Sequence, residues 1–109
     1  MIEYERRLLS KAIHAGQIEK LIALGIEESH FGDEMVRKTW GSITEHVIKY
    51  KTPPSIDAIV DRNPNFVPMV VSDSMEYVID QFFDGTKRRL TIEYLRLVAG
   101  AVDNPELGD

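Results

Sequence analysis

The sequence predicts an all-α protein, a small bundle of five or six helices of which the last is long. Apolar residues recur at the three- and four-residue steps of amphipathic helices, and no segment shows the strict alternation of a half-buried strand. Glycine, proline and capping residues separate the periodic stretches. With 109 residues, 43% of them hydrophobic and 28% charged, the chain has the size and composition of one globular domain.

Two helices are expected in the first 25 residues. The first runs from about Ile2 to His14, and Ala15-Gly16 ends it. Its apolar side consists of Tyr4, Leu8, Leu9, Ala12 and Ile13. The second is short and ends at Gly25, since glycine readily adopts the left-handed conformation that terminates helices. Its apolar face consists of Ile18, Leu21 and Ile22.

The clearest amphipathic pattern begins after Asp33, a suitable N-cap, and ends near Tyr50. Its apolar positions are Val36, Trp40, Ile43, Val47 and Tyr50, at steps of four and three. We expect Trp40 to be the central core residue, because a buried tryptophan contributes a large apolar area. The prolines of Thr52-Pro53-Pro54 break this helix.

A short fourth helix, capped by Ser55, is expected to end near Asn63-Pro64. Its apolar residues are Ile56, Ile59 and Val60. The segment from Asn65 to Ser72 is irregular and could form an extended piece as far as Val71. Asp73 and Glu76 then have the spacing of a capping box at the start of a fifth helix.

The fifth helix is expected to bury one face, made by Met75, Val78, Ile79, Phe82 and Phe83. Asp84-Gly85 is the weak point before the final helix. Two alternatives remain there: a break between two helices, or a kink in one long helix from Ser74 to Val102.

Residues Leu90 to Val102 carry more apolar surface than burial on one side requires. At about 100° per residue the apolar side chains span roughly 220°, whereas a surface helix needs a little over 100°. The helix must therefore be covered on two sides, either by assembly with other helices or by the rest of this chain. The residues predicted for subunit contact are Leu90, Tyr94, Leu97, Val98 and Ala101, with Leu95 and Val102 facing a further helix.

Composition narrows the class of protein. The chain has no cysteine, which excludes disulfides, thiolate catalysis and cysteine-ligated zinc. A net charge of -5 disfavours tight, sequence-independent binding to phosphate backbones. No apolar run approaches the ~20 residues of a membrane span, and the charged N-terminus is not a secretory signal. We expect a cytoplasmic protein with no membrane partner.

The sequence contains no recognisable catalytic or metal-binding motif. His14, His30 and His46 stand far apart, and none has a second histidine at the spacing by which one helix supplies two metal ligands. Asp57 and Asp61 could pair for acid–base work or Mg²⁺, although such a pair is more often a solvated face. There is no glycine-rich phosphate loop and no Gly-x-Ser-x-Gly elbow. We expect neither enzymatic activity nor a cofactor in this chain.

The one dense basic run is Lys87-Arg88-Arg89. It could contact nucleic acid or an acidic partner, or it could be the solvated start of the last helix. The solvated helix start is the simpler interpretation in an acidic chain. Contact with nucleic acid would support an alternative function, that of a free-standing all-α adaptor or a helix-turn-helix-type nucleic-acid-binding module.

Six landmarks follow one another in a characteristic order. They are Leu8-Leu9-x-x-Ala12-Ile13, Leu24-Gly25-Ile26, His30-Phe31, Arg37-x-x-Trp40-x-x-Ile43 with His46, Pro54-Ser55-Ile56-x-x-Ile59 and Glu76-Tyr77-Val78-Ile79. Together they resemble the N-terminal domain of DnaB-type replicative DNA helicases, in a divergent, phage-like form. The resemblance spans nearly the whole chain, but none of its landmarks is a catalytic signature. The chain departs from the family at Ser10 and Lys11, where the family has small glycines, and at Val70-Val71-Ser72-Asp73, where it has a glycine-rich turn.

The resemblance implies a non-catalytic collar domain of a hexameric helicase. Residues 1–85 would form the globular N-terminal domain, and residues 86–109 the first arm of a helical hairpin that associates subunits, from a dimer up to a hexameric ring. The collar would also dock primase or a helicase loader in the bacterial or phage-infected cytoplasm. ATP, Mg²⁺ and most DNA contacts would belong to a C-terminal ATPase domain. A reading frame that continues past Asp109 into a Gly-x-x-x-x-Gly-Lys-Ser/Thr motif would support this interpretation, and one that stops at Asp109 would favour the adaptor.

Overall fold

The computed structural model describes residues 2–103, with side chains as far as residue 99. Over that range the chain forms five α-helices, one short 3₁₀ helix and no strand, which confirms the predicted all-α fold. The elements are α1 (Glu3–Ala15), α2 (Ile18–Ala23), η1 (Glu28–His30), α3 (Glu34–Tyr50), α4 (Ile56–Arg62) and α5 (Met75–Asp103). No helix in this range is both long enough and apolar enough to cross a membrane.

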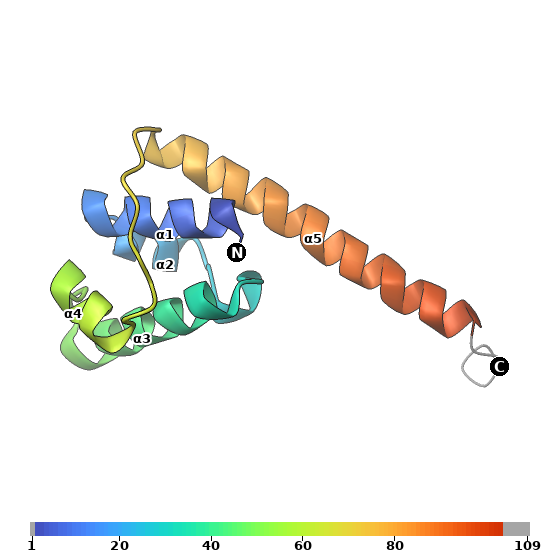
Figure 1. The fold of residues 1–109 in the computed structure, drawn as a ribbon, viewed down its shortest axis with the longest axis horizontal. Coiled ribbons are helices and arrows are strands. Elements are labelled where there is room, and N and C mark those ends of the chain that lie inside the picture. The colour runs from blue at the N-terminus through green and yellow to red at the C-terminus, as the bar shows by residue number, and fades with distance from the viewer. Residues whose placement is uncertain (1, 104–109) are drawn as a thin grey trace.

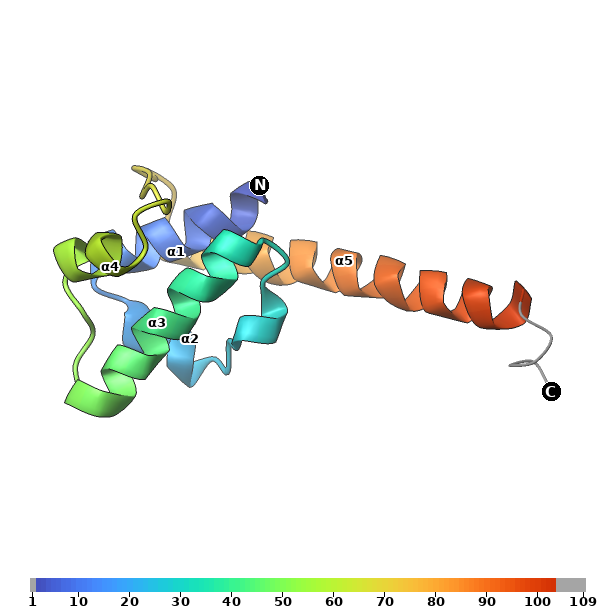
Figure 2. The ribbon, with the colours of Figure 1, turned by 60° about the horizontal axis from the view of Figure 1, so that its bottom comes forward.

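Helix α1 lies between α5 and α3 and contacts both (Figure 1). Helix α2 packs on α1, while η1 and α4 pack on α3. The C-terminal half of α5 extends away from every other helix, as Figures 1 and 2 both show. This projection raises the radius of gyration to 16.5 Å, against about 13 Å for a compact domain of this length.

The core is one continuous apolar cluster with Trp40 near its centre. Trp40 is 1% exposed, and its indole N–H donates a hydrogen bond of 3.2 Å to the carbonyl of Ile26. The ring of Phe31 lies 6.0 Å from Trp40 and 5.1 Å from Phe82 of α5, centroid to centroid. These contacts confirm the predicted role of Trp40. They also show that one core joins α3 to the first turns of α5.

Two of the predicted helix caps are confirmed and a third is wrong. The carboxylate of Asp33 accepts hydrogen bonds from two N–H groups in the first turn of α3, and the hydroxyl of Ser55 accepts one in α4. At the start of α5, however, the hydroxyl of Ser74 accepts the N–H of Tyr77, at 3.2 Å. Ser74 directly precedes the helix, so Asp73 is one residue too early to be the cap.

Four residues predicted on apolar faces are exposed instead: Ile22 (38%), Tyr50 (55%), Ile56 (37%) and Phe83 (42%). Ile22 belongs to a helix of only six residues, in which Ile18 and Leu21 alone are buried. Tyr50 ends α3 and lies against His46, with 4.6 Å between ring centroids. Phe83 is turned about 100° from its fully buried neighbour, Phe82, because adjacent helical residues point apart.

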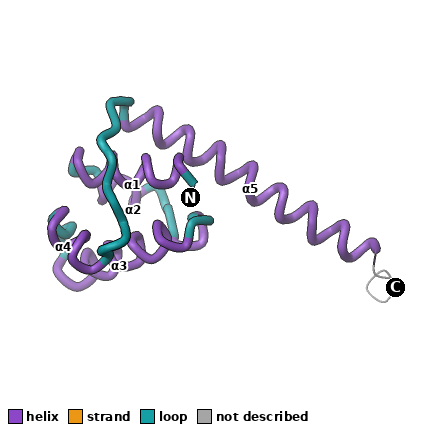
Figure 3. The backbone as a smooth tube through the Cα atoms, viewed as in Figure 1, coloured by secondary structure: helices purple, strands orange, loops and turns teal. Residues whose placement is uncertain are grey.

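A long irregular connection, drawn as a loop in Figure 3, crosses the molecule from α4 to α5. Side chains of α1 hold it, because Ser10 accepts the N–H of Met69 at 3.1 Å and Lys11 donates to the carbonyl of Val71 at 3.2 Å. Phe66 anchors its start in the core.

Candidate functional site

Helix α5 continues through Asp84-Gly85 without a break, so the single long helix is the correct alternative. Gly85 is buried against the ring of Tyr4, and a Cβ placed there would come within 2.5 to 2.8 Å of three ring atoms. The glycine thus permits a close approach of α1 to α5, at the modest cost of glycine inside a helix. The predicted boundary between residues 85 and 86 falls within this helix, and the division into two parts stays a prediction.

Residues 30–33, which precede α3, are held from both α1 and α5. The carboxylate of Glu5 is fully buried and accepts the N–H groups of Gly32, at 2.7 Å, and Asp33, at 2.9 Å. Burial raises the pKa of Glu5, against the lowering effect of these two hydrogen bonds and of the nearby Arg89. Arg89 of α5 donates to the carbonyl of His30 at 3.0 Å. These bonds join α1 and α5 to the segment that precedes α3.

The burial of Glu5 was not predicted, although the sequence contains a signal for it. At about 100° per residue, Glu5 falls between Leu8 and Leu9 on the helical wheel, in the middle of the apolar side of α1. A carboxylate in that position is buried as soon as the face is covered, and it then needs hydrogen-bond donors. The backbone of residues 32 and 33 supplies them.

The basic run lies in the middle of α5, so its interpretation as a helix start is wrong. Arg88 forms an ion pair with Asp84 at 2.7 Å, and Arg89 forms one with Glu93 at 3.0 Å. Lys87 is exposed and has no hydrogen-bond or ion-pair partner among the described residues. Two of the three positive charges are thus compensated within one turn of the same helix.

The apolar residues of α5 beyond the globule are exposed. Their exposed fractions are 41% for Leu90, 51% for Ile92, 65% for Tyr94, 59% for Leu95, 74% for Leu97 and 40% for Val98. The alternative in which the rest of the chain wraps this helix is therefore wrong over the described residues. The side chains of Ala101 and Val102, also predicted to lie in the interface, fall outside that range. That these residues form an interface stays a prediction.

Two hollows flank α5 where it leaves the globule. One, of about 470 Å³, has mostly apolar walls and is lined by His30, Phe83, Thr86, Lys87, Leu90, Thr91 and Tyr94. The other, of about 540 Å³, is lined by Ile2, Tyr4, Gly85, Arg88, Arg89, Ile92, Glu93 and Arg96. In the first hollow Thr86 is 5% exposed, and its hydroxyl has no hydrogen-bond partner among the described residues. We name this first hollow the Thr86 hollow.

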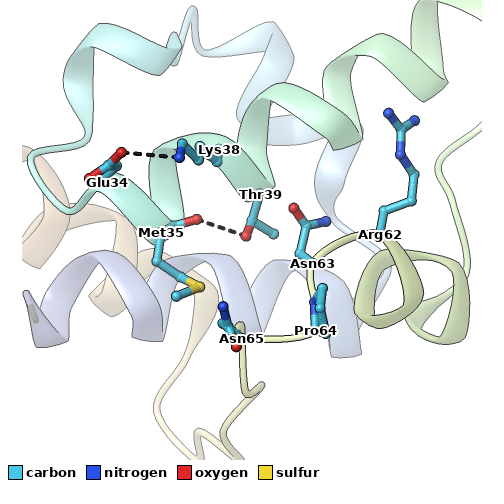
Figure 4. Close-up of a pocket in the computed structure, with 8 residues that line it drawn as sticks. All are labelled: Glu34, Met35, Lys38, Thr39, Arg62, Asn63, Pro64 and Asn65. Atoms are coloured by element: carbon cyan, nitrogen blue, oxygen red, sulfur yellow. Dashed lines mark hydrogen bonds and ion pairs between the residues drawn. The ribbon is translucent and has the colours of Figure 1, made fainter.

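A further hollow, of about 330 Å³, lies between the start of α3 and the end of α4 (Figure 4). Lys38 beside it pairs with Glu34 at 3.0 Å, and Thr39 donates its hydroxyl to a backbone carbonyl. Arg62 points away from the other labelled side chains, and its guanidinium lies 3.8 Å from Glu45. Asn63 donates to the hydroxyl of Ser42 and to the carbonyl of Ile59, so most polar groups here are engaged by neighbouring residues.

The histidines and the aspartate pair do not assemble into a metal centre among the described residues. Asp57 and Asp61 line an open hollow with His14, but no group of three or more His, Cys, Asp or Glu side chains in this range is arranged to hold a metal ion. The other two histidines serve local contacts. His30 accepts the N–H of Glu27, and His46 lies against Tyr50.

Comparison with known protein families, with curated proteins and with solved structures finds no match to this chain.

Proposed function

We propose that this chain is a non-catalytic assembly domain and that copies of it associate through the exposed apolar residues of α5. One observation carries the proposal: six large apolar side chains, each at least 40% exposed, lie on a helix that projects from the globule. Burying such surface is worth about 25 cal/mol per Å². Contiguous apolar surface of this kind is characteristic of interaction sites.

The resemblance to DnaB-type helicases supports a more specific form of the proposal. The chain would be the collar domain of a hexameric replicative helicase, would associate as a dimer up to a hexamer, and would dock primase or a loader in the cytoplasm. ATP, Mg²⁺ and most DNA contacts would belong to a C-terminal ATPase domain. In support, the landmark residues Phe31, Trp40 and Ile59 are buried in one core, and the last helix projects as an arm would.

Replacing Leu97 with glutamate is expected to dissociate the assembly. The wild-type chain should form dimers or larger species at micromolar concentration, and L97E should be monomeric, because a buried, unpaired carboxylate is strongly unfavourable. Sedimentation velocity measures this outcome. The helical circular-dichroism signal should persist, since Leu97 lies outside the core.

Ile48 provides a matched control, because it is apolar and 72% exposed on α3, against 74% for Leu97 on α5. I48E should assemble as the wild type does. A wild-type chain that stays monomeric at high concentration would contradict the assembly function.

The nucleic-acid-binding alternative predicts a different result. With Arg88 and Arg89 already paired to carboxylates, we expect the wild-type chain to bind DNA weakly, and the double variant K87E/R88E to bind no more weakly. Fluorescence anisotropy with a labelled duplex, repeated over a series of salt concentrations, measures this. K49E/K51E, altered at exposed lysines near the end of α3, is the control.

Tight binding that is lost only in K87E/R88E would establish the alternative instead. Its signature would be a steep linear fall of log K with log salt, because neutralised phosphates release counterions.

A further inference from the structure

The exposed side of α5 carries a seam with the spacing of a two-helix interface. Phe83, Lys87, Leu90, Tyr94 and Leu97 follow one another at steps of four, three, four and three, and all five are exposed. Apolar residues at this spacing line the contact between two helices that pack side by side. Lys87 is the one charged member of the seam and is among the residues that line the Thr86 hollow.

The Thr86 hollow accepts a particular kind of side chain. Its walls are mostly apolar, yet Thr86 within it carries a buried hydroxyl without a partner. A buried hydroxyl is unfavourable unless it is hydrogen-bonded. The occupant that suits the hollow is therefore apolar along its length and polar at its tip, as tyrosine is.

The seam itself supplies such a side chain. Tyr94 is 65% exposed and also lines the hollow. It follows Thr86 by eight residues, or about 12 Å along the helix axis, and Leu90 stands midway between them. A two-fold axis perpendicular to α5 at Leu90 would therefore bring Tyr94 of one copy level with Thr86 of the other.

We propose that two copies of this chain pair through antiparallel α5 helices about a two-fold axis at Leu90, and that each copy's Tyr94 fills the other's Thr86 hollow. The contact is self-complementary, as a two-fold interface requires. Leu90 packs on its own counterpart, and Leu97 of each copy is level with Phe83 of the other. The projecting half of each α5 is covered by the globule-bound half of its partner. This pairing rests on the assembly function proposed above and specifies its partner and geometry.

Engineered cysteines test the geometry, because the natural chain contains none. L90C should form a disulfide-linked dimer on mild oxidation. L97C alone should not, since the antiparallel pairing separates its two copies by about 21 Å along the axis, beyond the roughly 7 Å between Cα atoms that a disulfide can span. A mixture of F83C and L97C, one of them carrying a mass tag, should give the mixed dimer, which non-reducing electrophoresis resolves.

A double-mutant cycle tests the hollow and retains the apolar contacts of the seam. Y94F should weaken the dimer about 10- to 100-fold, because the two-fold pairing loses two hydrogen bonds that each contribute about 3- to 10-fold. T86V, which removes the hydroxyl at nearly constant shape, should bring no further loss when combined with Y94F. Sedimentation equilibrium measures all four dissociation constants.

The outcomes separate the two proposals. Dimers in which L97C links to itself would establish a parallel pairing and overturn the antiparallel one, while leaving the assembly function in place. Additive effects of Y94F and T86V would overturn the role of the hollow. A monomeric wild-type chain would overturn both proposals.

Discussion

Replacing Trp40 with alanine is expected to lower the free energy of unfolding by about 3–5 kcal/mol, the range for truncating a buried aromatic side chain. The indole is 1% exposed, contacts Phe31 and donates a hydrogen bond to the carbonyl of Ile26, which the variant would leave without that donor. Small domains unfold with about 5–15 kcal/mol in all. W40A should therefore unfold at a much lower urea concentration than the wild type, as measured by urea denaturation followed by circular dichroism.

Tyr50 serves as the control for this substitution, because it is an aromatic residue of the same helix that is 55% exposed. Y50A should cost less than about 1 kcal/mol, as surface substitutions do. If W40A lowered the free energy of unfolding by as little, the indole would have to be exposed, and its place in the core would be contradicted.

Replacing Glu5 with leucine is expected to cost about 2–6 kcal/mol. The carboxylate accepts hydrogen bonds from the N–H groups of Gly32 and Asp33, and each buried donor left without a partner costs about 1–3 kcal/mol. E5Q should cost less, since its amide keeps one acceptor oxygen. E3Q, in the same turn but exposed, is the control and should change stability by less than about 1 kcal/mol.

The contribution of Glu5 to the free energy of unfolding should also depend on pH. Burial raises the pKa of its carboxyl in the folded chain, while the Arg89 guanidinium and the two backbone N–H groups oppose the rise and Asp33 adds to it. As the pH rises above the ordinary glutamate pKa of about 4.3, the unfolded chain loses its proton first, and the folded state loses stability relative to it. This loss continues until the pH has passed the raised pKa of the folded chain. The difference in the free energy of unfolding between wild type and E5Q should therefore be largest at acidic pH and should decrease towards neutral pH.

Other carboxylates do not obscure this comparison. Hydrogen bonding and charge from Lys38 lower the pKa of Glu34, while a backbone hydrogen bond and Lys20 lower that of Glu76, so both favour folding at higher pH. Both groups are present in wild type and in E5Q, and their contributions cancel in the difference. If this difference instead increased as the pH rises from acidic to neutral, it would contradict the raised pKa of Glu5.

The helices could be predicted from the sequence because their signals are local. Periodicity placed α1, α3 and α4 within a residue or two of their bounds, and Asp33 and Ser55 were correctly assigned as caps. The cap of α5 was misplaced because Asp73 and Ser74 are adjacent and both are good capping residues. Only the three-dimensional path of the chain decides which of them reaches the first turn of the helix.

The candidate site was predictable in part. The apolar excess of residues 90–98 is a local property, and it identified the stripe that proved to be exposed. The Thr86 hollow was not predictable, because His30 comes from a distant part of the chain to form one of its walls. Phe83 was expected in the core for a similar reason: a helical wheel shows which residues share a face, but not which face another helix covers.

By itself, the sequence determined the helical class, the central place of Trp40 and the surplus of apolar surface at the end of the chain. Each of these follows from residue type and spacing, which act over a few turns of helix. Only the tertiary structure decided that α5 is continuous and that its second half stands uncovered. Those outcomes depend on contacts between residues far apart in the chain, Tyr4 against Gly85 and Arg89 on the carbonyl of His30. No local pattern encodes such contacts, because they form only when the whole core has packed.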